Sequence, residues 1–291
     1  MQVPSNCGKY GGGFRGGSSL SSIPLKEDMK SKDTIIELDC GHIAMTYTAL
    51  ASLVILGDDL SRVDRDGIQN HIRLLQCEDG SFYSSVGGSE NDMRFVYCAS
   101  TICYILQDFS ALNIEPAVKY IQKSISFEGG LGQGPFQESH GGPTFCGIAS
   151  LYLMGKLEAL NHLQKEKLVR WLLLRQNTEE GGFNGRPNKP ADTCYTYWVG
   201  ATLKLLNAFQ FVDKKLLVNF VLSTQDPITG GLGKYIGVNP DGMHTYLGLS
   251  GLSLIENNSL DFELNPVEPS LNISKRAFKH LRDLHEKWKQ C

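Results

Sequence analysis

Residues 180–206 read EGGFNGRPNKPADTCYTYWVGATLKLL, a glycine pair followed by a polar loop and then an apolar run. Glycines at such a point supply positive φ angles and let the backbone bend sharply. Pro187 and Pro190 stiffen the loop. The apolar run carries few charges on any side, which is typical of a helix that other helices surround. The stretch therefore predicts a tight turn that leads into a buried helix.

The same order of elements recurs about every fifty residues. Glycine motifs occur at 78–82 (EDGSF), 128–132 (EGGLG), 180–184 (EGGFN) and 229–233 (TGGLG), with aligned glycines 49, 52 and 49 residues apart. A glutamine precedes each motif: Gln76, Gln122, Gln176 and Gln225. GGGF at 11–14 fits the pattern if residues 18–38, rich in serine and charge, form an insertion. Repetition at this period indicates a helical-repeat architecture.

Each repeat is predicted to be a helix, a glycine turn and a second helix. The first helix carries charge and one apolar face, as in DKKLLVNFVLS at 213–223. The second is apolar nearly all round. Such units can form an open solenoid or a closed ring, and the second helices favour the ring, with themselves inside. We therefore expect one all-α domain over 1–291, an α/α toroid of about five repeats.

Bulk composition narrows the function classes. The chain has 28 Lys and Arg against 31 Asp and Glu, a net charge of −3, which argues against a nucleic-acid binder. Apolar stretches such as 148–154 are too short to span a membrane. The eight cysteines include no CxxC pair, which is typical of a reducing compartment. We expect a cytoplasmic protein.

Asp192, Cys194 and His244 stand at the starts of two successive second helices. His244 follows Asp192 by 52 residues, about one repeat, so neighbouring helices are expected to carry them. A carboxylate, a thiol and an imidazole with one open position form a catalytic zinc arrangement. A capping aspartate, a buried cysteine and a core histidine are the alternative. Both interpretations stay open on spacing alone.

Basic side chains lie near the same helix starts. Arg186 and Lys189 occupy the loop at 184–190, His140 precedes two glycines, and Lys234 lies in the next loop. Because helix N-termini attract anions, these residues form a candidate phosphate cradle. A solvated loop, a cap and a surface lysine are the alternatives.

Four further residues have two interpretations each. Tyr195, Tyr197 and Trp198 follow the ligand candidates and either fill the core or line an apolar tunnel. Arg94 opens an earlier second helix. Burial there would require an anionic partner, and a surface ion pair is the alternative.

Five longer blocks are far more specific together than any one motif. They are DCGHIAMTYTALASLVILGDDLSRV (39–63), ENDMRFVYCAS (90–100), ESHGGPTFCGIASLYLMGKLE (138–158), RPNKPADTCYTYWVGATLKLL (186–206) and PDGMHTYLGLSGLSL (240–254). They resemble the β subunits of protein prenyltransferases, and among these the type I geranylgeranyl enzymes. The resemblance covers nearly the whole chain and implies an α/α toroid that pairs with a helical α subunit.

The resemblance also assigns roles. It implies zinc ligands at Asp192, Cys194 and His244. It implies an isoprenoid diphosphate site whose residues are His140, Gly141, Gly142, Arg186, Pro187, Asn188, Lys189, Tyr195, Thr196, Tyr197 and Trp198. Arg94 is expected between the lipid and peptide sites.

Two positions discriminate within the family. Lys234 stands where farnesyl enzymes carry an aspartate associated with magnesium, and Leu247 where they carry a bulky tyrosine. The resemblance thus implies transfer of a C20 group from geranylgeranyl diphosphate to the cysteine of a C-terminal CaaX motif, often ending in Leu, on small GTPase-like proteins. Zinc would activate the thiol, and magnesium would not be required.

The alternatives are a farnesyl or Rab-type β subunit, a triterpene cyclase and an inactive helical-repeat binding subunit. A cyclase would need an acidic catalytic motif, and Asp58-Asp59, which follows a helix end, is a poor candidate. Members of the resembled family have helices before the segment that matches GGGFRGG. This chain starts almost on that segment, so we expect those helices to be missing from the ring.

Overall fold

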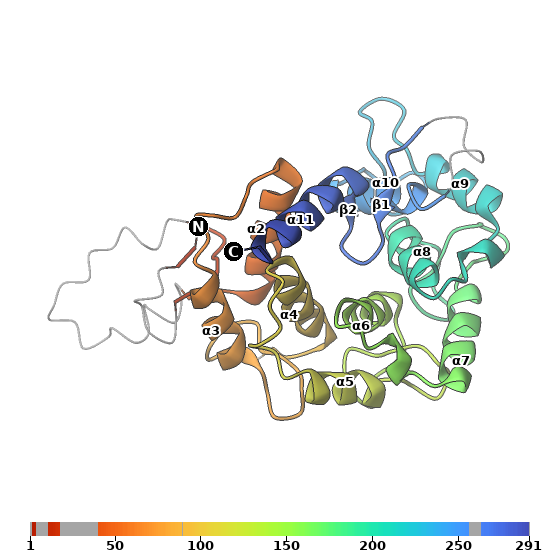
Figure 1. Ribbon diagram of the computed structural model, residues 1–291. Helices are drawn as coiled ribbons and strands as arrows, with labels where there is room; N and C mark the ends of the chain where they lie inside the picture. Colours follow the sequence, from red (N-terminus) through yellow and green to blue (C-terminus); the bar gives the residue numbers. More distant parts are fainter. Residues whose placement is uncertain (1, 4–10, 18–39, 89, 256–262, 291) are drawn as a thin grey trace, which may run out of the picture. The chain divides into compact units, whose positions relative to one another are not determined.

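The computed structural model describes residues 2–3, 11–17, 40–88, 90–255 and 263–290, which are mostly helical (Figure 1). The predicted insertion at 18–38 lies outside the described residues. The chain divides into two compact units. Unit 1 comprises Met1–Tyr120 and Arg276–Cys291, and unit 2 comprises Ile121–Lys275. None of the helices in the described ranges has the length and apolar character to cross a membrane.

Unit 1 contains α2 (Ile43–Leu56), α3 (Arg65–Leu75), α4 (Met93–Ile105) and most of α5 (Ile114–Lys123) and α11 (Lys275–Trp288). Unit 2 contains α6 (Gly141–Leu153), α7 (His162–Leu173), α8 (Tyr195–Leu205), α9 (Lys214–Ser223) and α10 (Gly242–Leu252). It also holds the short 3-10 helices η2 (Leu157–Ala159) and η3 (Phe209–Phe211), and the antiparallel strands β1 (Val267–Glu268) and β2 (Ile273–Ser274).

Helices of two kinds alternate, as the repeat predicts. In unit 2, α6 packs against α8 and α8 against α10, while α7 and α9 flank them (Figure 1). Nearly every residue of α6 and most residues of α8 are buried. By contrast, α7 buries one face through Leu168, Trp171 and Leu172. This difference follows from sequence, because only a helix without a charged face can be surrounded without leaving charges unpaired.

The glycine turn allows consecutive repeats to approach closely. Gly181 has φ of 86°, and a Cβ on it would lie 2.6 Å from the carbonyl oxygen of Leu216. Gly129, with φ of 104°, approaches Lys167 in the same way. Only glycine combines the left-handed conformation with this contact.

The recurring glutamine ties one repeat to the next. The side chain of Gln176 donates to the carbonyl of Asp213 at 2.9 Å and accepts from its N–H at 3.1 Å. In unit 1, Gln76 makes the same two bonds to Asn113, at 2.9 and 2.8 Å. These two glutamines thus satisfy backbone groups at the start of the next first helix.

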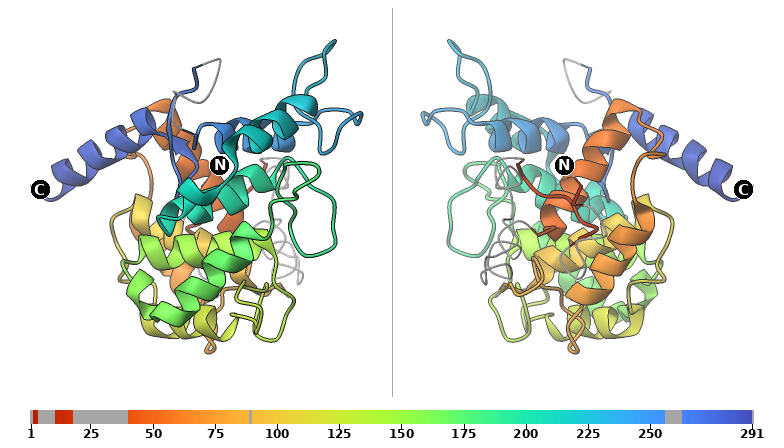
Figure 2. Two further views of the ribbon diagram at one scale, coloured as in Figure 1. Left: turned by 90° about the vertical axis from the view of Figure 1, so that its right-hand side faces the viewer. Right: turned by 90° about the vertical axis from the view of Figure 1, so that its left-hand side faces the viewer.

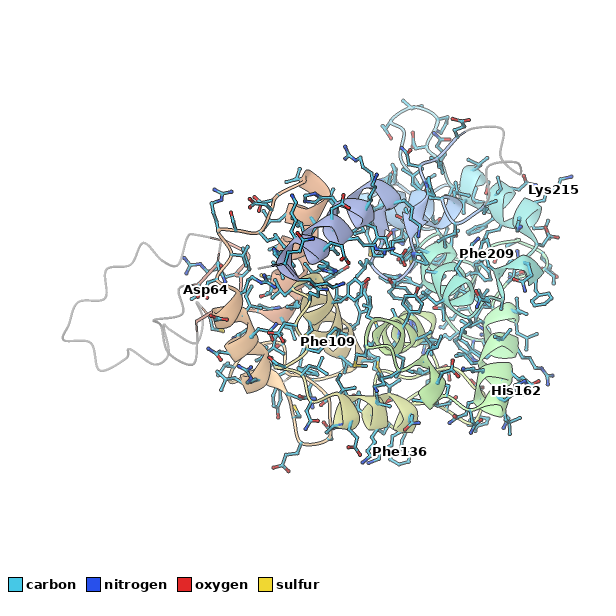
Figure 3. All side chains as sticks on the ribbon, in the orientation of Figure 1. Asp64, Phe109, Phe136, His162, Phe209 and Lys215 are labelled. Atoms are coloured by element: carbon cyan, nitrogen blue, oxygen red, sulfur yellow. The ribbon has the colours of Figure 1, made fainter. Side chains whose placement is uncertain are left out.

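The segment at 11–14 forms a turn of the same kind. Gly12 has φ of 97°, and a Cβ on it would meet the carbonyl oxygen of Gly67 at 2.0 Å. Gln2 bonds both backbone groups of Asp64, the residue that caps α3 (Figure 3). A single domain of about five repeats stays a prediction.

The loops of unit 2 bring the site together. In Figure 2, the loops that precede α6, α8 and α10 project on the same side. Each loop leads directly into the start of its helix, so polar residues at these starts are neighbours although about fifty residues separate them in sequence.

Candidate metal centre and anion pocket

The start of α8 supplies two of the three predicted metal ligands. Regular helix begins at Tyr195, so Asp192 and Cys194 precede it. Asp192 Oδ1 accepts a hydrogen bond from the backbone N–H of Cys194 at 3.0 Å. Both residues are 6% exposed. Because residues i and i+2 on a regular helix face different directions, only this non-helical entry lets both side chains serve one site.

The third candidate ligand, His244, lies in the first turn of α10. Ligand atoms of Asp192, Cys194 and His244 all lie within 4.8 Å of one another. His244 Nε2 lies 3.3 Å from Asp192 Oδ1, yet it is buried without a hydrogen-bond partner. Buried polar atoms nearly always have partners, so this nitrogen is available as a ligand. Sulfur, nitrogen and oxygen donors in this number fit zinc.

Sequence reasoning missed Asp241, which contacts His244 twice. Asp241 Oδ1 accepts from the backbone N–H of His244 at 2.9 Å, and Oδ2 lies 2.5 Å from Nδ1 of the ring. These bonds, the backbone one foremost, lower the pKa of Asp241. The signal in the sequence was an aspartate three residues before the histidine at a helix start, which is the position of an N-cap.

The sulfur of Cys194 is in surroundings that disfavour its charged form. Burial, together with the nearby carboxylate of Asp192, raises the pKa of the Cys194 thiol. A cation held among the three side chains would act in the opposite direction, because a metal ion deprotonates a coordinating thiol.

A cavity of about 270 Å³ adjoins the metal cluster. Asp192 belongs to both sites. The lining residues are His140, Gly185, Arg186, Lys189, Pro190, Asp192, Tyr195, Lys234 and Tyr235. The cavity thus gathers two lysines, an arginine, a histidine and two tyrosines from three successive loops and the start of α8. We refer to it as the anion pocket.

His140 and Tyr195 form a hydrogen-bonded pair in the anion pocket. His140 caps α6, and its Nδ1 accepts from the N–H of Gly142 at 3.2 Å. The proton of the neutral ring is therefore on Nε2, which lies 3.0 Å from the hydroxyl of Tyr195. Burial, and then the nearby Arg186, lower the pKa of His140. With His140 as donor, Tyr195 keeps its hydroxyl proton for an acceptor in the pocket.

The two glycines after His140 are engaged within the protein. Gly142 donates to His140, and Gly141 donates to the carbonyl of Gly185 at 2.8 Å. Gly185, which sequence reasoning missed, supports the ring of Tyr195: a Cβ on Gly185 would lie 2.4 Å from the hydroxyl oxygen. In the sequence, only its place as the third glycine of GGFNG (181–185) could have pointed to Gly185.

Two cations of the anion pocket, Arg186 and Lys234, have carboxylate neighbours. Arg186 is ion-paired with Glu138 of the preceding loop. Lys234 Nζ lies 3.6 Å from Asp192 Oδ2. A hydrogen bond with Tyr235, and then the charge of Asp192, raise the pKa of Lys234. Lys189 is exposed and lines the pocket.

The residues after Tyr195 lie away from the cavity lining. Thr196 and Tyr197 are fully buried, and the hydroxyl of Tyr197 donates to the carbonyl of Pro269 at 2.9 Å. Trp198 is half-buried and packs 5.1 Å from the ring of Phe145. In the structure these three residues pack within the protein. Their contact with substrate stays a prediction.

Pro187 and Asn188 shape the loop between the two cations of this repeat. Asn188 is exposed with φ of 61°, a left-handed conformation that asparagine tolerates. Neither residue lines the cavity. A direct role in binding diphosphate stays a prediction for both.

Arg94 belongs to unit 1, where it opens α4. Its guanidinium pairs with Asp92 at 2.7 Å and lies 3.6 Å from Glu90, with half of the side chain exposed. These contacts match the surface ion pair that the sequence left open. A position between lipid and peptide stays a prediction.

Comparison with known proteins gives one consistent result. The "Geranylgeranyl transferase type-1 subunit beta" of Arabidopsis thaliana is 40% identical over 276 residues, covering 91% of this chain and 70% of that protein. The protein of the same name from Dictyostelium discoideum is 41% identical over 273 residues, covering 94% and 74%. A solved structure, "Candida albicans protein geranylgeranyltransferase-I complexed with GGPP", matches with a TM-score of 0.77 at 28% identity, covering 94% of this chain and 79% of that one.

These matches confirm the predicted fold class and the predicted prenyltransferase of the type I geranylgeranyl class. The farnesyl, Rab-type and non-enzymatic alternatives are not favoured, because relatives at about 40% identity share the type I name. The family model described as "Prenyltransferase alpha-alpha toroid domain" matches residues 1–273. The chain therefore belongs to the prenyltransferase alpha-alpha toroid family.

Proposed function

We propose that the chain is the catalytic β subunit of a protein geranylgeranyltransferase that modifies the cysteine of a C-terminal CaaX motif, often ending in Leu, on small GTPase-like proteins. One observation carries the proposal: the anion pocket and the metal cluster share Asp192. A diphosphate in the pocket and a thiol at the metal cluster would then be neighbours.

The reaction needs a nucleophilic sulfur and a stabilised leaving group. The substrate sulfur forms a bond to C1 of geranylgeranyl diphosphate, the bond from C1 to oxygen breaks, and diphosphate leaves with the bonding electrons. The thiol proton passes to solvent. When bound, zinc would lower the pKa of a coordinated thiol, so that the sulfur reacts as thiolate at neutral pH.

Asp192, Cys194 and His244 would hold the zinc ion. All three residues are buried, and three protein ligands would leave a fourth position for the substrate thiol. The unpartnered Nε2 of His244 supports this assignment, since it would otherwise be a buried nitrogen without a bond.

The anion pocket would bind the diphosphate. Arg186, Lys189 and Lys234 carry positive charge, and Tyr195 can donate a hydroxyl proton that His140 leaves free. Donors that face developing charge supply about 3 kcal/mol each. Because the ammonium of Lys234 lies beside Asp192, it would neutralise the departing diphosphate where a magnesium ion would otherwise be needed.

An α subunit and a reducing compartment complete the proposal. The solved relative is a geranylgeranyltransferase-I, and β subunits of this class are named as parts of a larger enzyme. Among the described residues, Cys77, Cys98, Cys103 and Cys194 are free thiols. This fits a cytoplasmic location.

The test is a transfer assay on the full chain co-expressed with a prenyltransferase α subunit. Donors of 15 and 20 carbons are compared on CaaX peptides that end in Leu or in Ser. We expect the C20 donor and the Leu peptide to give the highest kcat/KM. A preference for the C15 donor, or no transfer by a zinc-loaded heterodimer, would contradict the proposal.

A further inference from the structure

The loop that carries two cations of the anion pocket, residues 184–190, is fastened at both ends, and we refer to it as the cation loop. Near its start, the carbonyl of Gly185 accepts from the N–H of Gly141, the first residue of α6, at 2.8 Å. Just past its end, the N–H of Ala191 donates to Oε2 of Glu180 at 2.8 Å. Because Ala191 is 1% exposed, this N–H depends on Glu180 for its hydrogen bond.

Glu180 is itself fixed within the glycine turn. Its backbone N–H donates to Oδ1 of Asn177 at 3.1 Å, and its Oε2 accepts from Nδ2 of the same residue at 3.0 Å. The carbonyl of Asn177 also accepts from the N–H of Gly181, and its own N–H donates to the carbonyl of Gly182, both at 2.8 Å. The carboxylate of Glu180 thus joins a well-bonded turn to the residue that precedes Asp192.

The preceding repeat has a comparable bond. The hydroxyls of Ser126, in the glycine turn, and Ser139 lie 2.5 Å apart. Ser139 comes directly before His140. Ala191 has the same place relative to Asp192. In both repeats a side-chain bond therefore fastens the glycine turn to the residue before a candidate site residue, and of these two repeats only the one with the cation loop uses a carboxylate.

A carboxylate at this place needs an explanation, because by its charge alone it would oppose an anion. Glu180 does not line the anion pocket, so it acts through the loop. We propose that Glu180 is a positioning residue that fixes the end of the cation loop and so orders Arg186 and Lys189 for the diphosphate. The inference rests on the proposed function in one respect, since it takes the anion pocket to be the diphosphate site. Without the bond to Glu180, the loop would have to be ordered when the anion binds, which lowers affinity.

Variants at two adjacent glutamates separate position from charge. Glu180→Ala and Glu180→Met both remove the acceptor of Ala191 together with a negative charge, and methionine keeps the length of the side chain. Glu180→Gln removes the charge but keeps an oxygen with two lone pairs. That one oxygen can serve both donors, because Oε2 alone accepts from Ala191 and Asn177 in the structure.

Glu179→Ala is the matched control. Glu179 is exposed, and its carboxylate makes no hydrogen bond or ion pair with the part of the chain that the structure describes. This variant therefore reports the loss of a negative charge next to Glu180 without any change at Ala191. Loss of charge alone would leave the affinity for an anion unchanged or increase it.

The experiment is calorimetry with inorganic pyrophosphate on the full chain co-expressed with a prenyltransferase α subunit. Every variant is purified identically and titrated well below its melting temperature, which is recorded separately. We expect Glu180→Ala and Glu180→Met to bind pyrophosphate about 10-fold more weakly than the wild type. Glu180→Gln and Glu179→Ala should bind it at least as tightly as the wild type. A loss of affinity on removal of a negative charge is opposite to the electrostatic effect, so its sign identifies the role of position.

Several results would overturn the inference. A lowered melting temperature with wild-type pyrophosphate affinity in Glu180→Ala and Glu180→Met would show that the bond is purely structural. An equal loss of affinity in Glu179→Ala, or in Glu180→Gln, would assign the effect to charge. A wild type that binds no pyrophosphate would remove the pocket itself.

Failure of the proposed function gives a different result. If the variants bind pyrophosphate as expected but the zinc-loaded wild type transfers no lipid, the enzyme assignment falls while the role of Glu180 at the anion pocket remains.

Discussion

The ammonium of Lys234 lies 3.6 Å from the carboxylate of Asp192, so a cation of the anion pocket adjoins a candidate metal ligand. The side chain of Thr193, between the candidate ligands Asp192 and Cys194, secures this arrangement by donating to the carbonyl of Gly233 at 2.7 Å. The backbone N–H of Thr193 also donates to the carbonyl of Lys234 at 3.1 Å. The loop that carries the lysine is thereby fixed to the segment that carries the candidate ligands, just before α8.

Replacing Lys234 should change the metal requirement. Lys234→Ala should lower the rate of transfer with little rescue by magnesium, because the cation beside the leaving diphosphate is lost. Lys234→Asp should also be slow but should respond to millimolar magnesium, since a second carboxylate beside Asp192 can recruit the ion. The measurement is the single-turnover rate of transfer for each variant, with and without magnesium. Lys215→Ala, an exposed position on α9 (Figure 3), is the control. A wild-type enzyme that depends strongly on magnesium would contradict the assignment.

Cys194→Ser should lose most bound zinc and nearly all transfer while keeping its helical circular-dichroism signal. An alcohol is a much poorer zinc ligand than a thiol, and the side chain is otherwise similar in size. His244→Ala should behave in the same way. Metal content by mass spectrometry and the transfer rate are the two measurements. Cys146→Ala on α6 should keep its metal and lose at most about 2 kcal/mol of stability. Unchanged zinc in Cys194→Ser would exclude this ligand set.

Glu138→Gln should strengthen pyrophosphate binding. Glu138 pairs with Arg186 in the structure, so an anion in the pocket must compete with a carboxylate for the guanidinium. Exposed ion pairs contribute about 0.2–1 kcal/mol, which corresponds to a gain of up to about fivefold in affinity. Calorimetry with inorganic pyrophosphate measures it. Glu158→Gln breaks a comparable exposed pair with Lys165 and should leave the affinity unchanged. Weaker binding by Glu138→Gln would show that the carboxylate helps to hold the anion.

Gly185→Ala should impair the donor site. A Cβ at this position would lie 2.3 Å from Cζ of Tyr195, so the ring must move and its bond to His140 must break. We expect KM for the C20 donor to rise about tenfold or more, the equivalent of about 1.4 kcal/mol. Gly242→Ala, where a Cβ would meet nothing within 4 Å, should have wild-type kinetics. Equal kinetics for the two variants would mean that donor binding does not require the Tyr195 ring to occupy the position seen in the structure.

Unit 1 should lose stability in mild acid because of His71. Burial lowers the pKa of His71 to about 4, well below the ordinary value of 6.5 for an imidazole. Between pH 6.5 and pH 4, His71 is therefore protonated in the unfolded chain but neutral in the folded chain. The free energy of unfolding falls as the pH drops through this range. The expected loss between pH 7 and pH 5 is about 2 kcal/mol. Urea unfolding at the two pH values should show a smaller difference for His71→Gln than for the wild type. His162→Gln, at an exposed position of α7 (Figure 3), should keep the wild-type difference.

Local features of the sequence determined the architecture and the types of ligand. A glycine with positive φ, an apolar run of helical length and a glutamine before each turn are readable within about fifty residues, because backbone conformation and helix periodicity are local properties. The same repeat spacing predicted that Asp192, Cys194 and His244 would meet, since equivalent positions of stacked repeats are neighbours.

Only the tertiary structure shows which of the site's side chains are ion-paired, which are fixed in place by neighbouring backbone and which are buried. The pairing of Arg186 with Glu138 joins loops 48 residues apart, and the contact of Gly185 with Tyr195 depends on how the loop folds back over α8. The hydroxyl of the buried Tyr197 finds its acceptor in the carbonyl of Pro269, 72 residues away. Even Asp241, three residues from His244, is read from sequence only as a cap. Its second bond requires the imidazole to turn toward it, and that orientation is set by the packing of α10 beside α8.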